Sequence, residues 1–217
     1  FLFQPASPET WLPMAQRPTY FDVWPDIASF NPAEPYLCIG GSSLYPYIKN
    51  FEALHGFRQL IQHIQSAYPG QIILTVSDGR DQPIFRPLAH QFNLPLIGLS
   101  TPVQQTVDIL GNAQAYIGGR WHPSIFALRG GTPIIPISSI TFKMQALAEM
   151  AGLSTPTFDA LRLVDNTGSI MNLLNSYLEQ GEELRRRLRL WAAHQSELSR
   201  ENISYLKMIS VSSNKKS

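Results

Sequence analysis

The sequence has few charged residues, and its charges nearly cancel. Asp, Glu, Lys and Arg make up 15% of the 217 residues, well below the roughly 25% of typical soluble domains. Seventeen basic residues against 16 acidic ones leave a formal charge of +1, which gives no bulk attraction to nucleic acid or anionic lipid. Neither partner is therefore expected, whereas a hydrophobic content of 44% is enough to fill a sizeable core.

Cysteine and long apolar runs are also scarce. Cys38 is the single cysteine, which excludes an intrachain disulfide and a cysteine-based zinc cluster and suits a reducing compartment. No apolar run reaches the roughly 20 residues that span a bilayer, and the first residues lack the basic and hydrophobic regions of a signal peptide. The sequence therefore predicts a cytoplasmic protein without a transmembrane segment.

Residues 1–35 differ in composition from the rest of the chain. They contain seven prolines, each of which removes a backbone donor and disfavours helix at the preceding residue. They also contain seven aromatic residues, too many for a free linker. We therefore expect an irregular lead-in or interdomain segment that packs against another surface.

From Tyr36 onward, short apolar runs alternate with longer amphipathic ones. Strands that are apolar on both faces indicate a parallel sheet covered by helices. The expected strands are 36–40, 71–76, 94–99, 115–119 and 132–137. The expected helices between and after them are 49–68, 81–92, 102–111, 123–130 and 141–151. This βαβ alternation predicts a Rossmann-like α/β domain over residues 36–209.

Two further helices are expected near the C-terminus. The first covers 167–180, with Asn166 or Thr167 as its N-cap, and the second covers 182 to about 208. The polar tail 210–217 is expected to be disordered.

In an open parallel sheet, ligands bind beyond the carboxyl ends of the strands, where loops lead into helix N-termini. Arg120 and His122 follow strand 115–119 in an expected extended stretch, so they should point the same way, before a helix that begins at Pro123. Arg120 can bind a carboxylate or phosphate with two hydrogen bonds, amides near Ser124 can add donors, and His122 can transfer a proton. The structural alternative is that His122 caps the helix and Arg120 pairs with a surface acid.

Other loops at the same edge supply four more candidate binding residues. Gly41 and Ser42 would let the backbone and a hydroxyl approach phosphate oxygens, although an ordinary turn also explains them. Asp78 can accept a sugar hydroxyl or form a turn. Lys143 opens the last helix and can reach an anionic ligand or remain a solvated side chain.

Several familiar chemistries lack their motifs. No GxGxxG follows the first strand, so a nicotinamide cofactor is not expected, and there is no P-loop, GxSxG elbow or paired-cysteine motif. The five histidines show no HExxH and no carboxylate partner at metal-binding spacing, so no metal site is expected. Among the chemistries considered, the sequence still permits a transfer reaction on an anionic substrate without a cofactor.

The stretch 115–153, AYIGGRWHPSIFALRGGTPIIPISSITFKMQALAEMAGL, resembles the polysaccharide pyruvyl transferase family. That family has a small residue, Arg, an apolar residue and His after a strand, then a helix with I-F-A-L-x-x-G. The sequence G-x-P-I-I, a Lys-containing loop and a helix ending in A-x-x-x-G-L follow. The corresponding segments here are 119–122, 125–128, 131–135, Lys143 and 148–153.

The resemblance implies a GT-B-like enzyme, in which two Rossmann-like domains face each other across a cleft and this stretch belongs to the C-terminal one. It implies transfer of a carboxyvinyl unit from phosphoenolpyruvate to two hydroxyls of a sugar in a surface glycan or exopolysaccharide, giving a pyruvate ketal. In that interpretation Arg120 and His122 would contact phosphoenolpyruvate, with His122 as the acid/base group and Arg120 balancing charge. Lys143 would assist at the phosphate.

Because members of the family are longer, the chain resembles the C-terminal, donor-binding half of such an enzyme. Its expected partners are a saccharide acceptor and a missing N-terminal domain or partner chain. Trp121 stands where the family often has Leu, and residues 138–142 stand where a Tyr-Asp pair is frequent. Two alternatives remain open. One is a GT-B glycosyltransferase whose nucleotide-sugar diphosphate the same Arg and Lys would hold, and the other is a non-catalytic anion-binding or scaffold domain.

Overall fold

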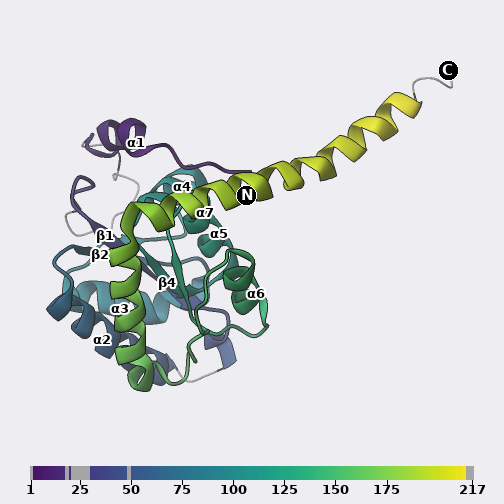
Figure 1. Ribbon diagram of the computed structural model, residues 1–217. Coiled ribbons are helices and arrows are strands. Elements are labelled where there is room, and N and C mark those ends of the chain that lie inside the picture. The colour runs from purple at the N-terminus through teal and green to yellow at the C-terminus, as the bar shows by residue number, and fades with distance from the viewer. Residues whose placement is uncertain (1, 18–19, 21–29, 48–49, 214–217) are drawn as a thin grey trace.

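The computed structural model describes residues 2–17, 20, 30–47 and 50–213, and a parallel five-stranded sheet lies at its centre (Figure 1). The strands lie in the order β3-β2-β1-β4-β5. Their bounds are β1 Tyr36–Ser42, β2 Gln71–Thr75, β3 Leu96–Ile97, β4 Tyr116–Gly119 and β5 Ile134–Pro136. The predicted Rossmann-like α/β class is confirmed, although β3 has two residues where six were expected.

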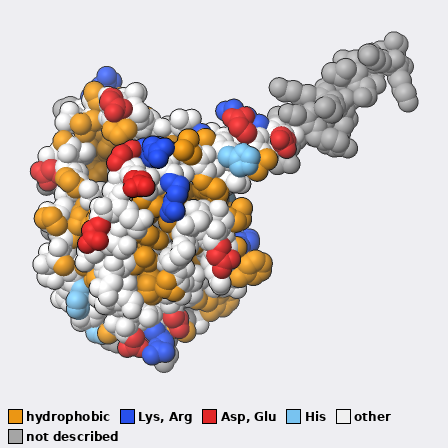
Figure 2. All heavy atoms as spheres, viewed as in Figure 1, with side chains coloured by type: hydrophobic (Ala, Val, Ile, Leu, Met, Phe, Trp, Pro, Cys, Tyr) orange, Lys and Arg blue, Asp and Glu red, His pale blue; other side chains and the backbone are white. Residues whose placement is uncertain are grey.

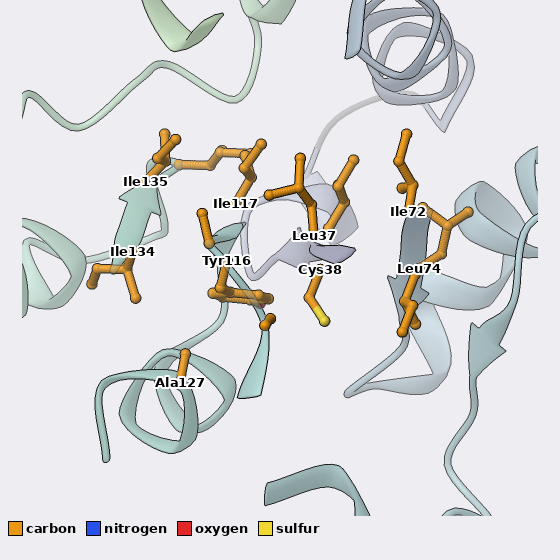
Figure 3. Close-up of a cluster of buried hydrophobic side chains, with 14 of the residues drawn as sticks. Leu37, Cys38, Ile72, Leu74, Tyr116, Ile117, Ala127, Ile134 and Ile135 are labelled. Carbon is orange, nitrogen blue, oxygen red and sulfur yellow. The ribbon is translucent and has the colours of Figure 1, made fainter. Parts of the chain in front are cut away.

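Hydrophobic side chains on both faces of the sheet form the core. Every residue of β1, β3, β4 and β5 is buried, as expected for a sheet covered by helices on both sides. Figure 3 shows Cys38 and Tyr116 pointing towards the side on which Ala127 of α5 lies, whereas Leu37 and Ile117 point to the opposite side. The sheet therefore has hydrophobic packing on both of its faces.

Five helices follow the strands as the alternating pattern predicted. They are α2 Asn50–Ala67, α3 Gln82–Phe92, α4 Val103–Asn112, α5 Trp121–Arg129 and α6 Lys143–Met150. Helix α2 packs against α3, and α4 packs against α5. Within the described part of the chain, no helix is long and apolar enough to cross a membrane.

The N-terminal segment is more ordered than the irregular lead-in that its prolines predicted. It contains α1, Pro8–Ala15, in which Pro8 occupies the first turn and the Ser7 side chain accepts a hydrogen bond from the Thr10 amide. Trp11 is only 2% exposed and donates from Nε1 to the Tyr20 hydroxyl over 3.0 Å. The rings of Trp11 and Phe30 lie 6.1 and 5.2 Å from that of Tyr36 in β1, so the described part of the segment packs on this same domain.

The C-terminal segment α7, Leu163–Ser213, consists of two helices that meet at a kink at Gly181 (φ 50°, ψ −128°), so the predicted division between 180 and 182 is confirmed. The expected start at 167 is wrong, because Thr167 lies inside the helix and its hydroxyl donates to the Leu163 carbonyl. Helical backbone continues through Ser213, and the expectation of a disordered tail from 210 stays a prediction. Residues 214–217 lie outside the described part.

Helix α7 packs against α2 and α5 before its last turns extend away from the sheet (Figure 1). Leu184 and Leu188 are buried, and Trp191 is half-buried against the core. The Arg185 guanidinium donates to the Gly111 carbonyl oxygen at the end of α4 over 3.1 Å. Figure 2 shows acidic and basic side chains interspersed with hydrophobic ones on this face of the molecule.

Candidate active site

A cleft of about 510 Å³ lies beyond the carboxyl ends of the strands. Its walls come from the loops that follow all five strands, including residues 76–78 after β2, 98–101 after β3, 119–123 at the end of β4 and 139–144 after β5. The chain runs outward from β1 to β3 on one side and from β4 to β5 on the other. The cleft is therefore at the topological switch point, where open α/β sheets bind ligands.

Arg120 lies at this switch point, directly after β4. Its Nε donates to Asp81 Oδ2 over 3.2 Å and its Nη2 donates to Asp81 Oδ1 over 2.6 Å. The Arg120 side chain is 11% exposed and Asp81 is fully buried. Arg120 thus pairs chiefly with a buried acid, and the guanidinium edge used by Asp81 is not available to a ligand.

Burial raises the pKa of the Asp81 carboxyl, whereas the hydrogen bonds and positive charge of Arg120 act against that rise. A further donor, the Ser77 amide, lies 3.3 Å from Asp81 Oδ2. The buried carboxylate is therefore stabilised by its partners rather than by water.

Two of the expected binding residues lie beneath the cleft instead of lining it. A Cβ added to Gly41 would be 2.3 Å from Asp81 Oδ1, so the missing side chain makes room for that carboxylate. The buried Ser42 hydroxyl donates to the Ser138 carbonyl oxygen over 2.5 Å and accepts from the Leu44 amide. Their neighbour Ser43 lines the cleft.

Asp78 does line the cleft, but it already has basic partners. Its carboxylate accepts two hydrogen bonds from the Arg80 guanidinium, at 2.8 and 2.7 Å, and one from the Arg80 amide at 2.9 Å. Its Oδ2 lies 3.8 Å from Arg120 Nη1. The hydrogen bonds from Arg80 lower the pKa of Asp78, so its carboxylate is ionised and its charge is balanced by Arg80 and Arg120.

His122 and Lys143 are exposed, and both line the cleft. The expectation of an extended stretch through His122 is wrong, because α5 begins at Trp121 rather than Pro123 and His122 is its second residue. Lys143 is the first residue of α6. Ser124 is fully buried, and its hydroxyl donates to the Arg120 carbonyl oxygen over 2.8 Å, so it supports the start of α5.

Three helix N-termini also reach the cleft. The first residues of α4, α5 and α6 line it, and none of the three N-cap residues makes a side-chain capping hydrogen bond. Unpaired N–H groups at these ends carry partial positive charge. Together with Arg120, His122 and Lys143, they make one side of the cleft suitable for an anion.

The sequence interpretation missed two features of the cleft. One is the apolar part of its wall, formed by Leu99, Val103, Trp121 and Phe126. The other is Asp81, which does not line the cleft but pairs with Arg120, because Asp and Arg side chains 39 residues apart give no local pattern. The available signal was that both follow strands of one parallel sheet at the same edge.

With the geometry established, comparison with known proteins identifies the family. The family model described as "Polysaccharide pyruvyl transferase" matches residues 22–140, more than half of the chain. The chain belongs to the polysaccharide pyruvyl transferase family. The match includes Asp78, Arg120 and His122, and it ends before Lys143. No curated protein sequence matches the chain.

Solved structures that resemble this family member include two glycosyltransferases. One is a mutant of the Thermobaculum terrenum O-GlcNAc transferase, with 16% identity, a TM-score of 0.49, and coverage of 79% of this chain and 34% of that one. The other is AviGT4, a glycosyltransferase involved in avilamycin A biosynthesis, with 14% identity, a TM-score of 0.40, and coverage of 92% and 57%. The chain thus spans about a third of the length of the first protein and just over half of the length of the second.

Proposed function

We propose that this chain is the donor-binding half of a polysaccharide pyruvyl transferase and that phosphoenolpyruvate binds in the cleft at the switch point. The observation that carries the proposal is the convergence of Arg120, His122 and Lys143 on one cleft from two separate loops. Phosphoenolpyruvate has a phosphate and a carboxylate, so it needs several cationic and N–H donors. The side chains and the uncapped helix ends supply both kinds.

Each cation has a distinct role in this proposal. Arg120 offers the N–H groups that Asp81 leaves unused, chiefly those of Nη1. Lys143 is exposed at the start of α6, where its flexible stem can follow the phosphate of the donor. His122 lies between them along the chain, at the N-terminus of α5, and is free to move a proton.

The balance of the reaction explains why a proton-transfer group is needed. Two sugar hydroxyls become bonded to C2 of the enol, the C2–O bond to phosphate breaks, and the methylene carbon becomes a methyl group. The two hydroxyls lose one proton each. One proton is gained by the methylene carbon, and the other leaves with inorganic phosphate. We assign this proton movement to His122 and charge stabilisation at the departing phosphate to Arg120 and Lys143.

The sugar acceptor and a second, GT-B-type domain are expected to cover the cleft. Three of the lining residues, Leu99, Val103 and Ile140, have large hydrophobic side chains that are exposed, and so does Phe142, which lies in the chain between the lining residues Thr141 and Lys143. Such apolar exposure favours a partner surface. Asp78, on the cleft wall, can accept a hydroxyl of the acceptor. The free, buried thiol of Cys38 is compatible with the cytoplasmic location that we propose for the reaction.

A second candidate is a glycosyltransferase that uses a nucleotide sugar. The apolar wall of the cleft, with Trp121, Phe126 and Leu99, favours it because a base or sugar ring can pack there. The same cations would then hold a diphosphate. The two candidates differ in which donor competes for the cleft.

Calorimetric titration of the chain with phosphoenolpyruvate, and separately with nucleotide diphosphates and nucleotide sugars, tests the proposal. We expect phosphoenolpyruvate to bind and Arg120→Ala to abolish binding. Because that change leaves the Asp81 carboxylate buried without its partner, Lys143→Ala, at an exposed position, is the second variant. Arg162→Ala, which removes an exposed ion pair with Asp165, is the control.

Selective nucleotide binding would favour the glycosyltransferase. If neither donor bound, the proposal that this chain alone forms the donor site would be wrong. The titration would then be repeated with the N-terminal half restored, to separate an incomplete enzyme from a non-catalytic binding domain.

A further inference from the structure

The Asp81 carboxylate is connected to the cleft through Arg120 and the Ser77 amide, both of which belong to lining residues. It is fully buried at the end of η3, Gly79–Asp81, and it does not line the cleft, whereas Arg120 does. A buried carboxylate is costly unless it is paired and hydrogen-bonded. An arginine that only faced solvent would not need a buried carboxylate as its partner. We therefore ask how Asp81 affects the Arg120 side chain.

The pairing geometry fixes the orientation of the guanidinium. Asp81 binds one edge of the planar group, through Nε and Nη2. A bidentate pair restricts rotation of the plane in a way that a single hydrogen bond does not. The edge that carries Nη1 faces the cleft and Asp78, whose Oδ2 lies 3.8 Å from Nη1.

Asp81 is itself held from two sides. The Ser77 amide donates to Oδ2 over 3.3 Å, and Gly41 packs so closely that a Cβ there would lie 2.3 Å from Oδ1 and 2.6 Å from the carboxyl carbon. The carboxylate therefore cannot move towards β1 while Gly41 keeps its backbone position. Residues near the end of β1 (Gly41) and in the segment after β2 (Ser77 and Asp81) thus determine the orientation of the guanidinium that follows β4.

We propose that Asp81 is a positioning residue, which holds the Arg120 guanidinium so that its free edge faces the anion-binding part of the cleft, and that Gly41 is required to make room for it. This inference rests on the proposed function for the role of Arg120 in binding the donor. The positioning itself is independent of which anionic donor the cleft takes.

Asp81→Asn tests the proposal with little change in side-chain volume. Asp108→Asn is the matched control, because Asp108 is also buried and accepts hydrogen bonds from the Ala6 amide and Gln104 Nε2, away from the cleft. Two quantities are measured for each variant at a temperature well below unfolding. They are the affinity for phosphoenolpyruvate and the rate at which phenylglyoxal modifies Arg120, followed by peptide mass spectrometry.

We expect Asp81→Asn to weaken phosphoenolpyruvate binding by about tenfold or more, the effect of losing a charge-assisted hydrogen bond. In an Arg120→Lys background, Asp81→Asn should weaken binding much less, because it acts through the guanidinium. Phenylglyoxal should modify Arg120 several-fold faster in Asp81→Asn and at the unchanged rate in Asp108→Asn. Unchanged affinity together with unchanged reactivity in Asp81→Asn would overturn the proposal.

Gly41→Ala gives a second route that removes no charge. It should displace the Asp81 carboxylate and raise the reactivity of Arg120, whereas Gly79→Ala should not, since a Cβ at Gly79 meets nothing within 4 Å. The phenylglyoxal measurement needs no ligand. If the unaltered chain failed to bind phosphoenolpyruvate, the donor assignment would be wrong. Faster modification of Arg120 in Asp81→Asn and Gly41→Ala would still support the positioning role of Asp81. Unchanged modification in both variants would contradict that role.

Discussion

Gly111, near the C-terminal end of α4, is in direct backbone contact with Gly130, which follows α5. A Cβ added to Gly130 would lie 2.1 Å from the Gly111 carbonyl oxygen and 2.4 Å from its Cα. The contact brings α4 and α5 close together at the edge of the sheet opposite the cleft. Since both helices begin at the cleft, their packing at the far end fixes the direction in which their N-termini point.

We therefore expect Gly130→Ala to destabilise the protein. The added methyl group has backbone, rather than a flexible side chain, as its neighbour, so the two helices must separate. Overpacking of this kind costs about 1–3 kcal/mol. Urea unfolding followed by circular dichroism would measure the free energy of unfolding.

Gly168→Ala is the matched comparison, and its expected effect has the opposite sign. Gly168 lies within α7 and a Cβ there meets nothing within 4 Å. Alanine in a helix is favoured over glycine by about 0.5–1 kcal/mol. Equal effects of the two substitutions on the free energy of unfolding would contradict the role assigned to the Gly111–Gly130 contact.

The alternation of the chain could be predicted because it depends on local patterns. Runs such as YLCIG are apolar throughout, and each became a buried strand, while three- and four-residue spacing identified α2. Helix ends were less predictable. Helix α5 starts at Trp121, two residues before Pro123, and its N-cap residue Arg120 makes no side-chain capping hydrogen bond. Helix α7 starts at Leu163, four residues before Thr167, although its division at Gly181 was predicted.

The candidate site could be predicted only at the level of its loops. Arg120, His122, Lys143 and Asp78 do line one cleft, because the carboxyl ends of parallel strands share an edge. The contacts that each of these side chains makes could not be predicted from a sequence pattern. Gly41 was interpreted as an approach for a ligand, whereas in the structure the Asp81 carboxylate occupies that space.

Arg120→Lys should weaken phosphoenolpyruvate binding by about tenfold. A lysine ammonium can reach one oxygen of Asp81 or the ligand, but it cannot bind both in the fixed geometry of a guanidinium. Titration calorimetry measures the dissociation constant, with Arg162→Lys at an exposed position as the control. An unchanged dissociation constant would remove Arg120 from the donor site.

Cys38 should be inert to thiol reagents in the folded protein. It is fully buried in β1, and desolvation raises the pKa of its thiol, so the reactive thiolate is scarce. Ellman's reagent should therefore release colour slowly in buffer and quickly in urea above the unfolding transition. Since the chain has one cysteine, the signal has a single source. Rapid labelling in buffer would show that β1 opens locally without global unfolding.

His122→Ala should separate binding from proton transfer. His122 is exposed at the second position of α5, so its removal should change the free energy of unfolding by less than about 0.5 kcal/mol. In a protein that also contains the acceptor-binding half, transfer should fall by about 10²–10⁴, the usual contribution of a positioned acid or base. Phosphate release from phosphoenolpyruvate measures the rate, and calorimetry on the same variant measures donor affinity.

His122→Gln keeps a hydrogen-bonding side chain but cannot transfer a proton at neutral pH, so it should be as slow as His122→Ala. Transfer at the unaltered rate in either variant would show that another group supplies the proton to the methylene carbon.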